Sequence, residues 1–589
     1  MTRSREPMVA RRDVLEGMGI GALGLAGAAL LGCGGSKGVG GTGQVAAHDS
    51  GQVAGATSGG GLPMNAPKVA GAIREGGTWQ VSGGATTEVE HDAGTARGGN
   101  IWHKISEKGI EPDPVTGANR PHVFTSWEIA DPSGTTLVFK LHPKLFIHNK
   151  SPWNGRQFTA EDAAWNLERI RGLYSERLKI PLASFQRASL LENMTKAVAV
   201  DPLTVKVTLS KPNSAFFNGL QDTRVPFMPR EMDDIGYTDP MKMGGIGPYQ
   251  VAEWVADVRT RFTKNPRYTE FRPGEPHFDT FQTIAIPDAV ASQSAFISGQ
   301  TQTISVAAPD TLLAVRKGRP DANLYTWVDS NWNHIRPSMT YKPFQDYRVR
   351  HAMHLAFDYK GNGDAVYGVD GGWAYQAALN PGYPEAWKPD KVKGLPGYNP
   401  DTKTADLAEG QKLMAAAGYP NGKGIDYDII FSGSTSDHAL RWQNYMVNAY
   451  ADMKVVQKPL GSSATFSNRQ AEGDFKMLAY VITASPDAVT EMIGQYGTGG
   501  SRNYGRFSDA DSDRILDKAI VELNRDARTK LLEEYQQKWF TDWRPIFVMH
   551  SNAVKTMVQG NVGGFDTIAG LWYGYSANTK VCRLYYVDK

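Results

Sequence analysis

The stretch from Leu324 to Tyr359 constrains the fold more than any other part of this sequence. It begins with a short strand-like run, Leu324–Val328, and continues through a polar segment that contains Asn331 and His334. Asp346 then provides a cap for the free amides at the start of a helix. Apolar residues recur after it with a helical period, at Val349, Ala352, Met353, Ala356 and Phe357. A strand, a polar crossing and a capped helix predict the place where an α/β chain enters a second lobe and lines the cleft between lobes.

Length, charge and cysteine content exclude several classes of protein. A chain of 589 residues is too long for one hydrophobic core and predicts two or three domains. The 63 basic and 61 acidic residues nearly balance, so the charge does not indicate nucleic acid as a partner. Cys33 and Cys582 are the only cysteines, which provides neither a disulfide framework nor a zinc-type spacing.

Residues 1–33 have the pattern of an export leader. Arg11 and Arg12 resemble a twin-arginine signal, and the apolar run that follows is shorter than the ~20 residues that cross a bilayer. The run ends at Cys33 in a Leu-Leu-Gly-Cys order that resembles a bacterial lipobox, where cleavage leaves a lipidated cysteine at the N-terminus. The alternative is a plain signal anchor with an incidental cysteine. Residues 34–70 are rich in Gly, Ser, Ala and Thr and predict a flexible tether.

Local motifs predict a folded body that begins near Glu75. Thr159 is expected to cap a helix, with Asp162 at the capping-box position. Residues 197–209 predict two strands around a turn that contains proline, and Gly418 is expected to end another helix.

The run from Tyr341 to Gly371 resembles the second-lobe signature of the family 5 extracellular solute-binding proteins, the dipeptide, oligopeptide and nickel receptors of bacterial ABC importers. That signature is a Pro-Phe-x-Asp-x-x-Val-Arg-x-Ala run before a helix that ends in Ile-Asp-Arg, and it is matched here by Phe344, Asp346, Val349, Arg350, Ala352 and Asp358. Tyr359 and Lys360 stand where the family has its last arginine. Other segments follow the family's order, among them Phe158–Asp162 and Gly245–Tyr268.

The resemblance implies an α/β fold of the two-lobed periplasmic-binding-protein type, in its three-domain form, with a hinge and an interlobe cleft. The first lobe would be discontinuous, an extra domain would sit on it, and a second lobe would follow. The implied ranges are 71–97, 210–305 and 545–589 for the first lobe, 98–209 for the extra domain, and 306–544 for the second lobe.

Nothing in the sequence indicates an enzyme, because no nucleophile elbow, zinc-protease motif or Cys/His pair occurs. His351 and His354 could share one helix face, but no further ligand accompanies them at metal spacing, so no metal site is predicted. His142 and His148 lie in a polar stretch and are expected at the surface.

The segment from Tyr480 to Thr490 occupies the place where peptide-binding members of the family carry a Trp-Gly-x-Asp run. In those members the aspartate binds the α-amine of the ligand. Aligned without gaps, Ala484 replaces this aspartate and only a second acid, Asp487, remains. Because a buried ammonium without an anionic partner is strongly unfavourable, ordinary free-amine peptides are expected to bind weakly. Ligand contacts are also expected, from position in the family's scaffold, for Trp332, Asn333, Tyr480 and Trp572.

The function implied by the resemblance is capture of a peptide or another small molecule by hinge closure, followed by delivery to an ABC permease and its ATPase. The protein would need no cofactor and would act as a monomer, lipid-anchored at the outer face of the cytoplasmic membrane or in the periplasmic space. A sensory receptor or periplasmic chaperone could use the same fold, and a secreted hydrolase is a further alternative.

Overall fold

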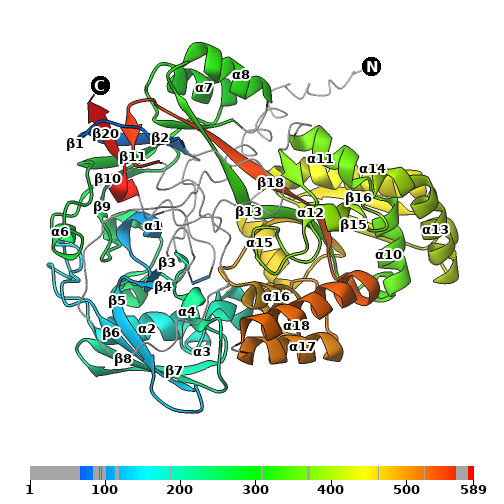
Figure 1. Ribbon diagram of the computed structural model, residues 1–589, viewed down its shortest axis with the longest axis horizontal. Coiled ribbons are helices and arrows are strands. Elements are labelled where there is room, and N and C mark those ends of the chain that lie inside the picture. Colours follow the sequence, from blue (N-terminus) through cyan, green and yellow to red (C-terminus); the bar gives the residue numbers. More distant parts are fainter. Residues whose placement is uncertain are drawn as a thin grey trace, which may run out of the picture.

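The computed structural model describes residues 67–83, 92, 94–95, 101–112, 119–185, 187–306, 309–367, 372–461, 463–522, 524–565 and 581–588. These residues form a mixed α/β molecule with three bodies around separate sheets (Figure 1). We call them the first lobe, the small domain and the second lobe. Among the described helices, none has the length and apolar character needed to span a membrane.

The first lobe gathers strands from distant parts of the chain. Its main sheet has the order β2–β11–β10–β9, with bounds Thr78–Gly83, Thr280–Ala285, Arg259–Lys264 and Tyr249–Val255, and its β2–β11 pair is parallel. A second sheet has the order β1–β20–β19, with bounds Ala72–Arg74, Tyr585–Asp588 and Val562–Gly563. Since β1 pairs with β20, the two ends of the described chain meet in this lobe.

The small domain is an antiparallel sheet with one long helix against it. The sheet has the order β5–β6–β8–β7, with bounds Phe124–Ile129, Thr136–Leu141, Thr204–Leu209 and Met194–Asp201. Helix α2 (Ala160–Ile170) packs on it, and the predicted capping box of Thr159 and Asp162 is present. The apolar side chains of this domain and of the first lobe form one continuous core, from Trp79 to Leu584.

The second lobe is built on the largest sheet. Its strand order is β12–β18–β13–β17–β15–β16, and β14 pairs with β18. The bounds are β12 (Thr303–Ser305), β18 (Phe547–Val558), β13 (Asn323–Pro337), β17 (Met477–Thr483), β15 (Asp426–Phe431), β16 (Lys454–Pro459) and β14 (Trp373–Ala374). The helices of the lobe include α10 (Tyr347–Ala356), α11 (Tyr359–Tyr367), α13 (Lys403–Ala416), α14 (Ser436–Ala449), α15 (Ser463–Glu472), α16 (Ala488–Tyr496), α17 (Ala510–Val521) and α18 (Arg525–Lys538). As predicted, Asp346 caps α10, its Oδ1 accepting from the Arg348 amide at 2.8 Å.

Strands β13 and β18 run side by side and connect the two cores (Figure 1). At one end of β13, Trp327 belongs to the core of the first lobe, and at the other end Ile335 belongs to the core of the second. The strand register shifts between Val328 and Trp332, which is where the core changes. This pair of strands is therefore the structural link on which a hinge between the lobes would act.

Two local predictions need correction. The short strand and polar crossing predicted from Leu324 are one continuous strand, because β17 and β18 on either side provide backbone partners for the polar residues. His148, expected at the surface, is fully buried. Its amide donates to Gly245 O at 3.0 Å, and its Nε2 lies 3.3 Å from Gly247 O. Burial, helped by Lys150, lowers the pKa of His148 to about 3.

Candidate ligand-binding site between the lobes

The small domain and the segment that follows it contact the second lobe along a line that we call the seam. Four hydrogen bonds define it: Ser501 Oγ to Ser189 Oγ at 3.2 Å, Ser214 N to Ile520 O at 2.8 Å, Asn218 Nδ2 to Asp487 Oδ2 at 3.1 Å, and Arg224 Nη2 to Ala484 O at 3.1 Å. The second-lobe partners lie just after β17, at the start of α16, in the loop after α16 and on α17. The structure thus places the Tyr480–Thr490 segment, singled out by its sequence, at the contact between lobes.

Ala484 lies directly against a cation. Its side chain is fully buried, its amide donates to Ser330 O at 2.8 Å, and its carbonyl accepts from Arg224. The guanidinium of Arg224 is itself paired with Asp222, whose Oδ1 accepts from Nε at 2.7 Å. The position at which the peptide-binding pattern has an aspartate therefore has no negative charge of its own and faces a guanidinium group.

Asp487 is engaged by protein donors on both carboxylate oxygens. Oδ1 accepts from the amides of Val489 at 2.9 Å and Thr490 at 3.2 Å, which caps α16. Oδ2 accepts from Asn218 and lies 3.3 Å from Nη1 of Arg528. Because each oxygen already has two donors, Asp487 has little capacity left for a ligand ammonium group.

Tyr480 is brought together with other aromatic rings near the seam. It is half-buried, and its ring centroid lies 5.7 Å from that of His334, 5.9 Å from that of Phe466 and 6.0 Å from that of Tyr504. Such a group offers apolar stacking area with polar edges, which is the usual lining of a small-molecule site.

The other predicted contacts are either buried within the second lobe or lie outside the described residues. Trp332 is 1% exposed and belongs to the core of the second lobe, with its ring 5.3 Å from that of His334. Asn333 is buried and its Nδ2 donates to the hydroxyl of Tyr367 at 2.9 Å. Trp572 and Cys33 lie outside the described residues.

A cluster of arginines at the seam, buried apart from the half-buried Arg187, was not found by sequence reasoning. We call Arg187, Arg224, Arg336, Arg502, Asp222 and Glu491 the seam cluster. Arg502 donates to Glu491 Oε2 at 2.5 Å, to Ser485 Oγ at 2.6 Å and to Thr483 O at 2.9 Å. The members come from widely separated parts of the chain and no common motif marks them, so only the folded structure reveals the cluster.

The histidine pair of α10 has a structural role. His354 is buried, with Nδ1 2.7 Å from the hydroxyl of Tyr359 and Nε2 2.9 Å from the carbonyl oxygen of Pro396. Within the described part of the chain, no group of three or more potential ligands could hold a metal ion. Both ring nitrogens of His354 are thus engaged by protein groups.

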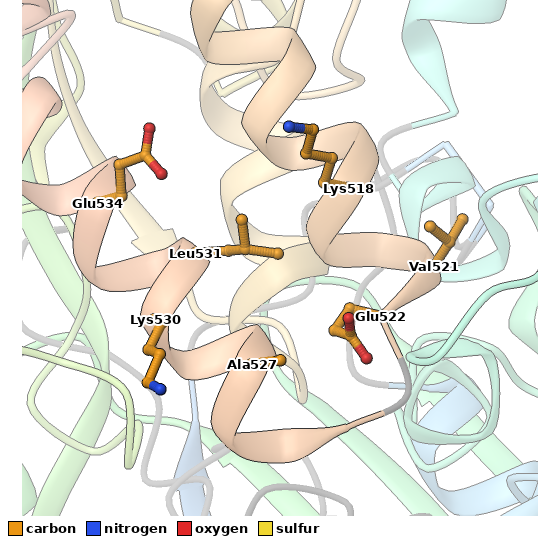
Figure 2. Close-up of a pocket in the computed structure, with 7 residues that line it drawn as sticks. All are labelled: Lys518, Val521, Glu522, Ala527, Lys530, Leu531 and Glu534. Atoms are coloured by element: carbon orange, nitrogen blue, oxygen red, sulfur yellow. The ribbon is translucent and has the colours of Figure 1, made fainter.

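An open groove of about 510 Å³ lies between helices α17 and α18 (Figure 2). Its walls alternate charged and apolar side chains, namely Lys518, Val521, Glu522, Ala527, Lys530, Leu531 and Glu534. None of these residues belongs to the seam cluster or to the predicted ligand contacts. We therefore place the candidate site at the seam and not in this groove.

Comparison with known proteins agrees with this architecture. Residues 119–503 match the family model described as bacterial extracellular solute-binding proteins, family 5. The heme-binding protein A of Haemophilus influenzae is 25% identical over 78% of this chain and 84% of its own length. The di/tripeptide-binding protein 1 of Pseudomonas aeruginosa is 26% identical over 71% of this chain and 78% of its own.

Solved structures show the same fold. The periplasmic binding protein DppA from Helicobacter pylori, in complex with the peptide STSA, superimposes with a TM-score of 0.71. The alignment covers 87% of this chain and 99% of that chain at 19% identity. The fold is thus the two-lobed α/β fold of the peptide-binding proteins, and the relatives are binding proteins of ABC importers rather than enzymes. The family match spans well over half of the sequence, and the chain belongs to the family 5 bacterial extracellular solute-binding proteins.

Proposed function

We propose that this protein is the substrate-binding subunit of an ABC importer and that it captures a peptide or peptide-sized solute between its two lobes. The observation that carries the proposal is the seam, where residues from both lobes converge next to the β13–β18 link. A ligand that contacts both lobes stabilises the closed arrangement by its differential affinity for that state. Membership in this solute-binding family supports the further proposal that the protein delivers its ligand to a permease and ATPase.

The preferred ligand is not an ordinary peptide with a free α-amine. Ala484 provides no carboxylate and faces Arg224, and Asp487 is engaged by Asn218 and Arg528. An ammonium group brought to this part of the seam would be desolvated without gaining a free anionic partner. Neutral, acidic or amine-blocked ligands are therefore favoured.

Calorimetry with matched peptides tests this ligand preference. The probes are tripeptides of one sequence, either free at the N-terminus or N-acetylated. We expect the acetylated form to bind at least as tightly as the free form. Tighter binding of the free peptide, lost on acetylation and in Asp487→Asn, would show that Asp487 holds the amine and would overturn the preference.

Small-angle scattering tests the closure itself. A probe that binds between the lobes should reduce the radius of gyration, and at about a hundred times its Kd it should add about 2.7 kcal/mol to the free energy of unfolding. Stabilisation of this size without compaction would indicate a rigid site and contradict capture by closure.

We further propose that Cys33 carries the lipid anchor that holds the mature protein at the outer face of the cytoplasmic membrane. The support is the lipobox-like sequence that ends at this residue. Membrane fractionation of wild type and Cys33→Ala tests it, together with mass spectrometry of the N-terminus, which detects any uncleaved leader. Processed Cys33→Ala protein that stays in the membrane as fully as wild type would refute the anchor.

A further inference from the structure

Positive charge exceeds negative charge in the seam cluster, in which Arg187 is half-buried and the other members are buried. Its described members are four guanidinium groups and two carboxylates. Arg224 pairs with Asp222, and Arg502 pairs with Glu491. Arg187 and Arg336 have no carboxylate of a described residue within ion-pair distance. A buried charge is costly unless it is paired, so these two arginines require an explanation.

Arg336 is accounted for by neutral partners. Nη1 donates to the carbonyl oxygen of Gln495 at 3.1 Å, Nη2 donates to the Gln495 side chain, and Nε lies 3.4 Å from Nε2 of His334. Its guanidinium also faces the ring of Tyr504 at 5.9 Å. Burial lowers the pKa of Arg336 to about 10. The contacts of Arg336 therefore lie within the second lobe, where its role is structural.

Arg187 is different, because its guanidinium has no protein hydrogen bond among the described residues. Its Nε is buried without a partner. Burial, with Arg224 and Arg502 nearby, lowers the pKa of Arg187 to about 10, which still leaves the group charged at neutral pH. The partial burial of this cation is therefore not offset by a hydrogen bond or an ion pair to any described residue.

The surroundings of Arg187 come from both sides of the seam. The residue precedes the short helix η2 (Ala188–Leu191), which contacts α16, and Ser189 lies within hydrogen-bond distance of Ser501. A Cβ at Gly494 would lie 3.1 Å from Ser189 Oγ and 3.4 Å from Arg502 Nε, so the glycine permits the close approach. Arg187 is thus held beside the second lobe by the packing of its own helix.

Two donors on the second-lobe side are also without partners. Nε of Arg502 and the hydroxyl of Tyr504 are buried and make no hydrogen bond to a described residue. Tyr504 lies beside Tyr480, and both phenols are close enough to Arg187 or Arg502 to interact with them electrostatically. Unpartnered donors from both lobes therefore converge on one part of the seam.

We propose that Arg187, together with Arg502 and Tyr504, binds an oxyanion of the captured ligand, a carboxylate or a phosphate. The guanidinium fork matches the geometry of either group, and hydrogen bonds between charged partners are the strongest that a protein makes. The proposal rests on the proposed function and makes it more specific, since the anionic group would bridge the two lobes. An anionic ligand would reduce the excess of positive charge in the seam cluster.

The test uses N-acetylated tripeptides of one sequence in three forms, ending in a free carboxylate, ending in a carboxamide, or ending in a carboxamide with one O-phosphoserine. Calorimetry measures each form against wild type, Arg187→Gln, Arg187→Lys and Tyr504→Phe. Arg514→Gln is the matched control, because Arg514 is an exposed arginine that pairs with Asp511. Unfolding curves confirm that every variant folds.

We expect wild type to bind the carboxylate or the phosphate form at least tenfold more tightly than the plain carboxamide, as a charged hydrogen bond of this kind should provide. The carboxylate and phosphate arms identify which oxyanion the site takes. Arg187→Gln should remove this preference, Arg187→Lys should restore part of it, Tyr504→Phe should weaken it, and Arg514→Gln should keep it.

Equal binding of all three forms by wild type, with no change in Arg187→Gln, would overturn the oxyanion site and leave the proposed function intact. An anion preference that persists in Arg187→Gln would also overturn it. Binding of no form by wild type would instead count against capture of peptide-sized ligands, and the oxyanion proposal would fail with it.

Discussion

Two largely buried groups of charged residues in this molecule differ in their charge balance. In the first lobe, Glu111 accepts from Arg272 at 2.8 Å and from Arg583 at 2.9 Å, and Arg583 also lies 3.2 Å from Glu275. Glu107 accepts from His122 at 2.7 Å. We call these residues, Glu107, Glu111, Glu275, Arg272, Arg583 and His122, the balanced network. Here every cation has a carboxylate partner, whereas the seam cluster leaves Arg187 without one.

The difference indicates what each group does. Burial opposes the charge on Arg583, yet Glu111 and Glu275 raise its pKa above the ordinary value. At Arg187, burial and neighbouring cations both act to lower the pKa. In the balanced network every cation has a carboxylate partner within the protein, so the network stabilises the fold. Under the oxyanion proposal, the seam cluster is unbalanced because a ligand supplies the missing negative charge.

The largest expected effect comes from unbalancing the first-lobe network. Glu111→Gln removes the carboxylate that Arg272 and Arg583 share, and breaking a buried pair on one side typically costs about 3–5 kcal/mol. We expect a loss of this size in the free energy of unfolding, measured in urea without ligand. A matched change in the exposed pair, Asp511→Asn, should leave the urea midpoint unchanged. An equally small effect of Glu111→Gln would mean that this network contributes little to stability.

Asp487 provides the second test, because it lies at the seam yet is fully paired. Its partner Arg528 is buried and lies 3.3 Å from Asp487 and 3.5 Å from Glu385. Asp487→Asn keeps a capping side chain but removes one charge partner, so we expect a loss of about 2–3 kcal/mol in unfolding free energy. A change in ligand affinity without loss of stability would place Asp487 among the ligand contacts instead.

The pH dependence of the unfolding free energy tests the burial of His148. The pKa of His148 is about 3 in the folded protein and about 6.5 when unfolded. Below pH 6.5 the unfolded state therefore takes up a proton that the folded state does not, and stability falls as pH falls. Between pH 7 and pH 5 this amounts to about 2 kcal/mol. His148→Gln should remove that part of the pH dependence, and an unchanged slope would contradict the burial of this ring.

A histidine at the seam should respond to ligand as well. Burial, Arg336 and Arg502 hold the pKa of His334 well below its ordinary value. An oxyanion bound nearby would offset the two cations and raise this pKa. Proton uptake on binding, measured by calorimetry in buffers of different ionisation enthalpy, should therefore appear in wild type and disappear in Arg187→Gln. Equal proton uptake in both proteins would separate His334 from the anion site.

The burial of His148 also shows where sequence reasoning reached its limit. The caps at Thr159 and Asp346 could be predicted because a cap is a hydrogen bond between residues two or three positions apart. The two-lobed fold was predictable from family motifs such as the Tyr341–Gly371 run. His148 could not be placed in this way, since it is buried by a loop around Gly245 that lies far along the chain.

Part of the candidate site could also be predicted from the sequence, and part could not. The Tyr480–Thr490 segment was recognised from its sequence, and the structure places it at the seam. Trp332 could not be distinguished from a core residue, because a buried strand and a cleft edge use the same aromatic side chains. The seam cluster had no sequence signal, because charge balance depends on which distant residues become neighbours, as Arg187 and Arg502 do.

The smallest expected effect is on the stability of ligand-free Arg187→Gln. Glutamine keeps a polar side chain at this position but removes a buried charge that has no described partner. Such a change leaves no carboxylate behind unpaired, unlike Glu111→Gln, which leaves two arginines with less negative charge. We therefore expect the unfolding free energy to stay within about 1 kcal/mol of wild type or to rise, because replacing an unpaired buried charge is often neutral or stabilising.

Urea unfolding without ligand measures this, with Arg502→Gln as the contrast. That variant leaves Glu491 without its cation and should unfold at a clearly lower urea concentration. A loss of 3 kcal/mol or more in Arg187→Gln, about the cost of breaking a buried pair, would show that Arg187 already has a partner within the protein, and the distinction between the two charge groups would fail.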